Sequence, residues 1–178
     1  MRHTQLLPRH FIYLLNEVIS RSLKETGKAF SIESKHIRAG VFEAEERIYE
    51  QVIEGYTTPA KDPRKASDAV LKELNSAFTW SDFDKVASKV TKQGIPGASD
   101  RSELMSMLTE IGAVGRVVGE SEIYREGVFE YMVPHKLIFS ERDIFCVHPV
   151  FSEICHVNTN FDGVKPVYTY LMRHDKSY

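Results

Sequence analysis

Two cysteines and two histidines near the C-terminal end of the sequence are the residue types that could bind a metal ion. They are Cys146, His148, Cys155 and His156. Common zinc sites pair their ligands two to four residues apart, and the spacing C-x-H followed by C-H is not such a pattern. Cys146 also lies inside the apolar run 144–147, where a buried, reduced thiol is the ordinary role of cysteine. The pattern therefore favours a structural role, and we expect neither a metal nor another cofactor.

The sequence contains no motif for a chemical reaction. A phosphate-binding P-loop needs an upstream glycine and a following hydroxyl residue, and the pair formed by Gly27 and Lys28 has neither. Neither a G-x-S-x-G nucleophile elbow nor an H-E-x-x-H zinc motif occurs. We therefore expect that the chain is not an enzyme on its own.

Composition sets the class of protein. The 178 residues, 42% hydrophobic and 27% charged, are typical of one or two small globular domains. No apolar run is long enough to cross a membrane or to form a signal sequence, so no membrane association is expected. Two cysteines are too few for a disulfide framework, which favours a reducing, cytoplasmic setting. With a net charge of -2, any binding of nucleic acid would need a local basic patch.

The stretch 81–133 predicts helix, short turn, helix, glycine turn and two strands, the order of a winged helix-turn-helix. Its first helix begins at Ser81 with Asp84 three residues on, an approximate capping box, and the second is capped by Asp100. Gly112 is expected to end the second helix in the left-handed conformation. Both helices carry an apolar stripe at positions i, i+3, i+4 and i+7. The stripes are Phe83, Val86, Ala87 and Val90, then Leu104, Met107, Leu108 and Ile111.

Further elements are expected on both sides of this stretch. The expected helices are 6–23, 31–56, 64–78 and 148–157, and the expected strands are 113–119, 128–133, 137–139, 144–147 and 166–172, with 120–127 as a polar tip. The predicted fold class is α+β and mainly helical, an N-terminal helical bundle followed by a winged helix-turn-helix domain. The polar, proline-marked run 59–65 is the expected boundary. The chain then divides into a helical segment 1–60, a winged-helix domain 61–157 and a tail 158–178 with a further strand.

The two N-terminal helices carry apolar stripes at helical spacing. In 6–23 the stripe is Phe11, Leu14, Leu15, Val18 and Ile19. In 31–56 one stripe is Ile37, Val41, Ala44, Ile48 and Val52, and its neighbour is Phe42, Tyr49, Ile53 and Tyr56. Two adjacent stripes are typical of a helix that packs between two neighbours.

The helix 100–111 would be the recognition helix of the winged module. With its apolar stripe facing the core, the positions expected to face outward are Arg101, Ser102, Met105, Ser106 and Thr109. Arg101 stands at the N-terminal end, where base contacts are usually made. Phosphate contacts would come from cations on the preceding helix and on the hairpin, namely Lys85, Lys89, Lys92, Arg116 and Arg125. Three glutamates on the hairpin, Glu120, Glu122 and Glu126, would repel a phosphate backbone. Contact with DNA and a protein-packing role therefore both stay open.

The run 2–16, RHTQLLPRHFIYLLN, resembles a known family segment. Its pattern R-x-x-x-L-x-P-R-x-x-I-x-x-L-N is similar to the one that begins the helical lid of bacterial AAA+/STAND-type P-loop ATPases. The pieces 111–115, 128–131 and 147–151 also look like the end regions of such proteins. In these families a winged-helix domain follows the lid. The resemblance thus implies that 1–60 is lid-like, and the abrupt start is expected of a segment of a longer polypeptide.

The resemblance also implies a role for Arg9. It matches the lid arginine that reaches the nucleotide phosphates as a sensor, and its alternative is a solvent-exposed arginine in the first helical turn. The implied function is a C-terminal regulatory or interaction module of a P-loop ATPase. Its expected partners are the nucleotide-binding core and, as a further candidate, DNA. The alternative is a stand-alone winged-helix protein that acts through protein–protein contacts, with an oligomer as one form.

Overall fold

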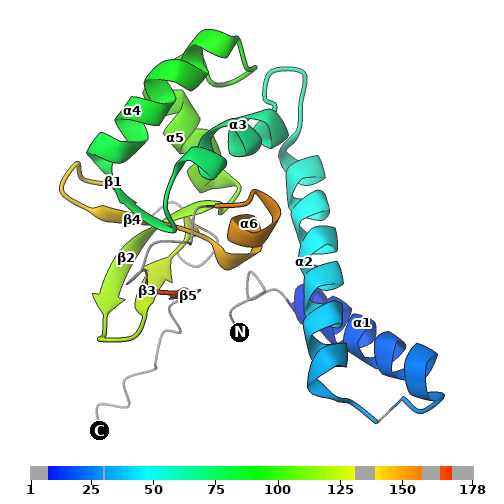
Figure 1. Cartoon of the computed structure of the whole chain (residues 1–178). Coiled ribbons are helices and arrows are strands. Elements are labelled where there is room, and N and C mark those ends of the chain that lie inside the picture. Colours follow the sequence, from blue (N-terminus) through cyan, green and yellow to red (C-terminus); the bar gives the residue numbers. More distant parts are fainter. Residues whose placement is uncertain (1–7, 30, 131–138, 158–164, 170–178) are drawn as a thin grey trace, which may run out of the picture.

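A computed structural model describes residues 8–29, 31–130, 139–157 and 165–169 (Figure 1). The α-helices are α1 (Pro8–Thr26), α2 (Ser34–Tyr56), α3 (Pro63–Val70), α4 (Trp80–Val90), α5 (Arg101–Glu110) and α6 (Pro149–Ile154). The strands are β1 (Ala77–Thr79), β2 (Val114–Glu120), β3 (Arg125–Val128), β4 (Ile144–Val147) and β5 (Val167–Thr169). Two 3-10 turns, η1 (Leu71–Glu73) and η2 (Thr91–Gln93), follow α3 and α4. The structure confirms an α+β, mainly helical fold.

One sheet connects segments of the chain between Ala77 and Thr169. Its strand order is β1-β4-β2-β3-β5, in which the first four strands are antiparallel and β5 runs parallel to β3. Residues far apart in sequence become neighbours, because Phe78 of β1 pairs with Phe145 of β4. Their rings stack with centroids 5.6 Å apart, so the edge strand is anchored by aromatic packing as well as by its backbone.

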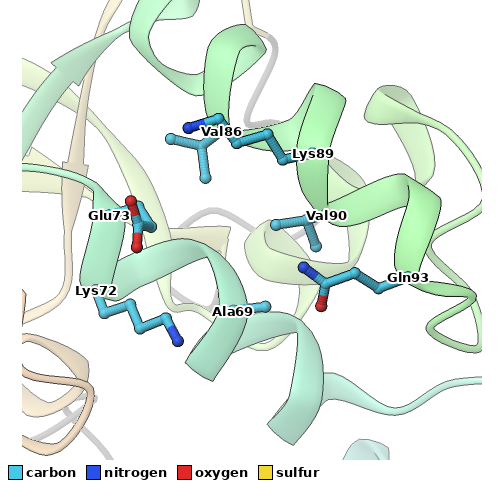
Figure 2. Close-up of a pocket in the computed structure, with 7 residues that line it drawn as sticks. All are labelled: Ala69, Lys72, Glu73, Val86, Lys89, Val90 and Gln93. Atoms are coloured by element: carbon cyan, nitrogen blue, oxygen red, sulfur yellow. The ribbon is translucent and has the colours of Figure 1, made fainter.

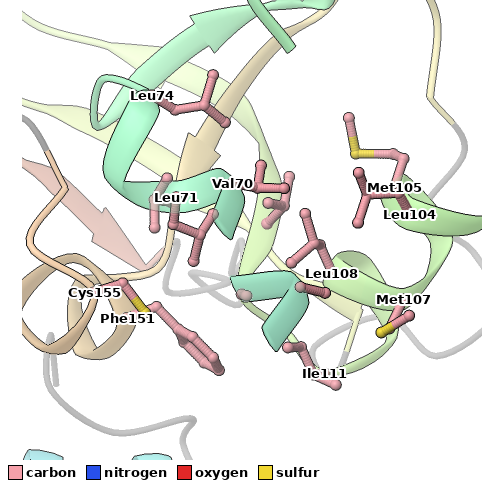
Figure 3. Close-up of a cluster of buried hydrophobic side chains, with 14 of the residues drawn as sticks. Val70, Leu71, Leu74, Leu104, Met105, Met107, Leu108, Ile111, Phe151 and Cys155 are labelled. Carbon is pink, nitrogen blue, oxygen red and sulfur yellow. The ribbon is translucent and has the colours of Figure 1, made fainter. Parts of the chain in front are cut away.

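The main hydrophobic core lies between the helices and this sheet. It takes fully buried side chains from α4, β4 and α6, among them Phe83, Phe145 and Phe151. Figure 3 shows the region where α3, α5 and α6 bring apolar side chains together. The C-terminal half of α2 joins the same core, since the ring of Tyr49 meets the edge of Phe151 at 5.3 Å. The helix α2 is therefore packed onto the sheet-containing part of the chain.

The N-terminal helices form an antiparallel pair, and α1 lies against the half of α2 that is farther from the sheet (Figure 1). Gly27, with φ 69°, ends α1 after Thr26, three residues beyond the expected end. The stripe predictions were partly wrong. Most stripe residues in the C-terminal half of α2 are buried, but Tyr56 at its end is 40% exposed, and in the N-terminal half Ile37 is 48% and Phe42 56% exposed. The reason is that only the C-terminal half of α2 has the core as a second neighbour.

The expected helix 64–78 was wrong in its second half. The helix α3 ends at Val70, tightens into η1, and Leu74 is already extended. The next residues form β1, which pairs with a strand 65 to 69 positions later in the chain. That long-range pairing outweighs the local helical periodicity of Val70, Leu74 and Phe78.

The start of α4 also differs from the expectation. Thr79 is the N-cap, and its hydroxyl accepts the N–H of Asp82 while the Asp82 carboxylate accepts the N–H of Thr79. The capping box is therefore Thr79 and Asp82 and not Ser81 and Asp84, because the extended strand β1 runs directly to Thr79. The predicted ends of α5 are confirmed, with Asp100 accepting two N–H groups at the start and Gly112 at φ 72° after the end.

The hairpin of β2 and β3 is tighter than expected. Strand β3 begins at Arg125 and ends at Val128, and the connection shrinks to four residues because the Ser121 hydroxyl accepts the N–H groups of Ile123 and Tyr124. The expected strand 128–133 was thus wrong for residues 129–130, because β3 ends at Val128. Residues 131–133 lie outside the described residues. Strand 144–147 is confirmed, while Phe139 is not in a strand and 137–138 lie outside the described part.

The C-terminal elements are shorter than expected. Helix α6 spans Pro149–Ile154 within the expected 148–157, with His148 as its N-cap. Strand β5 covers three residues of the run 166–172, of which 170–172 are not described. In the described part of the chain, no helix combines the length and the apolar character needed to cross a membrane.

Candidate nucleic-acid interface

Helix α5, the expected recognition helix, is more deeply buried than its apolar stripe predicts. Arg101, Ser102 and Ser106 are exposed, as expected. Met105 and Thr109 are only 4% and 8% exposed, so the prediction that they face outward was wrong. Met105 belongs to the main core (Figure 3), and the Thr109 hydroxyl donates to the carbonyl oxygen of Met105. The helix is packed on more than one side, which leaves a narrow polar strip.

The strip that α5 exposes is more acidic than basic. Arg101 donates to the carboxylate of Asp84 on α4, so its charge is already balanced within the chain. Glu103 and Glu110 are exposed on the same helix, and Glu110 pairs with Lys61 at 2.6 Å. A phosphate group approaching α5 would therefore meet carboxylates beside its single arginine.

The lysines expected to contact DNA lie on α4 and on the turn η2 that follows it, which holds Lys92. Lys85 lies 3.7 Å from the carboxylate of Asp82. Lys89 and Lys92 are exposed and have no carboxylate partner among the residues that the structure describes. Lys89 lines an open groove of about 240 Å³ between α3 and α4, which also holds Lys72 (Figure 2). Its other lining residues are the apolar Ala69, Val86 and Val90 and the polar Glu73 and Gln93.

The cations of the β2–β3 hairpin also face carboxylates. Arg116 lies 3.9 Å from Asp143, and Arg125 forms an ion pair with Glu120 at 3.5 Å. Glu120 in addition accepts from Lys165 at 2.6 Å, and this ammonium holds the pKa of the Glu120 carboxyl below its usual range. The hairpin therefore carries a local charge network in place of a free basic patch.

Four of the six cations expected to contact DNA are thus paired inside the chain, and two are not. Each exposed pair is weak by itself, roughly 0–1 kcal/mol, and does not lock its arginine or lysine in place. Their combined effect is on the electric field, because each carboxylate cancels the long-range attraction that steers a cation toward phosphate. The surface of α5 and the hairpin is therefore poorly suited to bind a nucleic-acid backbone.

The nucleotide-sensing candidate Arg9 lies in the first turn of α1, in the helix that was expected, and its side chain lies outside the described residues.

The cysteine and histidine residues near the C-terminus have structural environments. Cys146 is fully buried in β4, and burial raises the pKa of its thiol to about 12. The Nδ1 atom of His148 accepts the N–H of Val150 at 3.2 Å and so caps α6. In the described part of the chain, no group of three or more His, Cys, Asp or Glu side chains could hold a metal ion.

Sequence reasoning missed two surface features. The first is the groove with Lys72, because 64–78 was expected to be one continuous helix. The second is the exposure of apolar side chains on α1, where Phe11 and Leu15 were assigned to a packed face. The sequence does contain a signal for the exposed apolar side chains of α1. Charged residues recur at every fourth position, at Glu17, Arg21 and Glu25, and this row could have been recognised as a face that packs toward α2.

Comparison with known proteins gave no match: no protein-family model fits the chain, and no curated protein or solved structure is significantly similar to it. The similarity of 2–16 to the lid of P-loop ATPases therefore rests on the residues themselves.

Proposed function

We propose that this chain is the helical-lid and winged-helix module of a P-loop ATPase, and that it acts through protein contacts and not by recognising DNA sequences. The observation that carries the second part is the pairing of Arg101 with Asp84, at the position where a recognition helix would make its first base contact. A regulatory module of this kind needs no catalytic residues of its own.

The order of elements supports the winged-helix assignment. Helices α4 and α5, joined by a turn with Gly94 and Gly97 at positive φ, are followed by the β2–β3 hairpin. Strand β1 precedes α4 and adds a further strand to the sheet, with β4 between it and β2. The burial of α5 on several sides supports a packing role for this helix.

In this proposal the nucleotide-binding core is supplied by another segment or another chain. Arg9 would reach the nucleotide from the lid, because a guanidinium can follow the charge of the terminal phosphate across hydrolysis. Helix α1 suits such a task, since its main neighbour is α2 and it lies apart from the sheet (Figure 1).

A DNA titration tests the proposed absence of sequence recognition. Duplex DNA is titrated by fluorescence anisotropy at ~50 mM and ~200 mM salt, a range over which six to ten phosphate contacts lose about 10³–10⁵ in affinity. We expect weak binding at most, abolished at the higher salt and unchanged by Arg101→Ala. Tight binding to one sequence that Arg101→Ala weakens would refute this part of the proposal.

The ATPase part needs a separate experiment. The DNA upstream of the codon for Met1 is sequenced to find a P-loop, either in the same reading frame or in the adjacent gene. The nucleotide-binding core that contains this P-loop is then combined with the present chain in an ATPase assay. Arg9→Ala should then lower ATP turnover, whereas Arg38→Ala, an exposed arginine of α2, should not. Equal turnover for wild type and Arg9→Ala would remove the sensor role.

A further inference from the structure

Three charged side chains of helix α1 form ion pairs with α2. Glu17, Arg21 and Glu25 recur every fourth residue and form one ridge along the helix. Arg21 pairs with Glu43 of α2, and Glu17 lies 3.0 Å from Arg47. Glu25 accepts from Lys35 at 2.9 Å and lies 3.2 Å from the buried His36. The contact between the two helices is therefore rich in ion pairs.

A second ridge of α1 is apolar and faces solvent. Phe11, Leu15, Ile19 and Leu23 also recur every fourth residue. Phe11 is 44%, Leu15 41% and Leu23 51% exposed, Ile19 is half-buried, and the adjacent Ile12 is 55% exposed. Scattered single apolar residues on a surface are normal, but a row of large ones along four turns marks an interaction site. Val18 is buried against α2, so this ridge is a second apolar surface of α1 that α2 does not cover.

We propose that the apolar ridge of α1 binds the same ridge of a second copy of this chain, with the two α1 helices antiparallel. A two-fold interface must be self-complementary, because a residue i that contacts residue j of the other copy implies that j of the first copy contacts i of the second. The ridge satisfies this condition by its spacing, since its four residues lie symmetrically about position 17. An antiparallel pair then places Phe11 against Leu23 and Leu15 against Ile19 of the other copy. This inference goes beyond the proposed function and does not depend on it.

The charges of α1 fit a second copy as the occupant. Each residue of the ridge is uncharged, and the three charged residues of the neighbouring ridge are already paired with α2. Two identical surfaces therefore meet without repulsion between like charges. Ridges at i±4 spacing from two helices also interdigitate at the commonest crossing angle of helices in globular proteins. In the antiparallel arrangement the helix dipoles attract each other as well.

Sedimentation velocity on the full chain over a concentration series tests the partner. We expect a species of twice the 20.4 kDa chain mass. Leu15→Glu should raise the dissociation constant of the dimer at least roughly tenfold, because it puts a carboxylate in place of a leucine that the dimer would bury. The matched control is Ile123→Glu, at an apolar position 74% exposed in the β2–β3 connection, which should leave the dimer intact.

A chain that is monomeric at ~100 µM, where even weak specific interfaces associate, would overturn the proposal. So would a dimer that Leu15→Glu leaves unchanged. A monomer whose α1 ridge binds an isolated nucleotide-binding core would also overturn it, by assigning the ridge to another occupant.

Two double variants test the orientation. Phe11→Glu with Leu23→Lys places opposite charges against each other in an antiparallel pair, whereas Phe11→Glu with Leu23→Glu places like charges there. We expect the first to dimerise at least roughly tenfold more tightly than the second at low salt. Equal dissociation constants would refute the antiparallel register. Circular dichroism should show unchanged helix content in both, since all substituted positions are exposed.

Discussion

The backbone of Gly40 in α2 touches the backbone of Val18 in α1. A Cβ atom added at Gly40 would lie 2.6 Å from the Val18 nitrogen and 2.7 Å from its Cα, closer than real contacts allow. Gly40 is therefore required by close approach, and not by a special backbone angle. Because α1 depends on α2 for most of its packing, this contact sets the distance at which the ion pairs of the two helices form.

We predict that Gly40→Ala destabilises the α1–α2 pair despite the better helix propensity of alanine. Propensity would gain up to about 1 kcal/mol, while overpacking against a backbone costs about 1–3 kcal/mol. The measurement is hydrogen exchange of α1 amides together with the urea midpoint. Gly55→Ala in the same helix is the control, because nothing lies within 4 Å of its added Cβ, and it should stabilise slightly. Slower exchange in Gly40→Ala would contradict the prediction.

A second prediction separates the observed cap of α4 from the one expected from sequence. Thr79→Ala removes the hydroxyl that accepts the Asp82 N–H and should cost about 1 kcal/mol. Ser81→Ala, one residue inside the helix and exposed, should change stability by less than ~0.5 kcal/mol. Urea denaturation of both variants decides the matter. An equal loss of unfolding free energy in the two variants would mean that the cap is not at Thr79.

The parts of this fold that were predictable from sequence are those fixed by local chemistry. The two helices α4 and α5, the cap at Asp100 and the left-handed Gly112 depend on residues within one or two turns of each other. Strand β4 was also predictable, because its four apolar residues are bounded by polar ones.

The parts that failed depend on contacts far along the chain. Strand β1 exists because Phe78 pairs with Phe145, which no local periodicity encodes. The burial of Met105 depends on neighbours on a second side of α5, and the exposure of Leu15 depends on which face of α1 packs against α2. For the candidate site, the sequence shows which residues are charged but not which of them pair, since Asp84 and Arg101 are 17 positions apart.

A third prediction concerns acid stability. Hydrogen bonds from Thr79 lower the pKa of Asp82, and the backbone N–H of Lys65 lowers that of Asp62. Since each pKa is lower in the folded chain than in the unfolded chain, their contribution is complete above about pH 4 and is lost as pH falls through the folded values. Asp62→Asn with Asp82→Asn keeps the capping oxygens and should therefore lose less stability than wild type between pH 7 and pH 3. Parallel losses in urea midpoint would contradict this.

The last prediction concerns the two thiols. Burial raises the pKa of both Cys146 and Cys155 to about 12, with the charge of Asp68 adding to the effect at Cys155. Because pH 8 lies far below that value, almost none of either thiol is ionised in the folded chain. A disulfide reagent at pH 8 should thus react slowly, at a rate set by local opening, and both thiols should react at once in denaturant. Tyr49 of α2 packs on Phe151 of α6, and both the Tyr49 hydroxyl and the Cys155 thiol donate to the Asp68 carboxylate. Tyr49→Ala should therefore speed the reaction of Cys155 and leave that of Cys146, in the sheet, unchanged. Rapid reaction of either thiol in the native wild type would show that it is not enclosed as described.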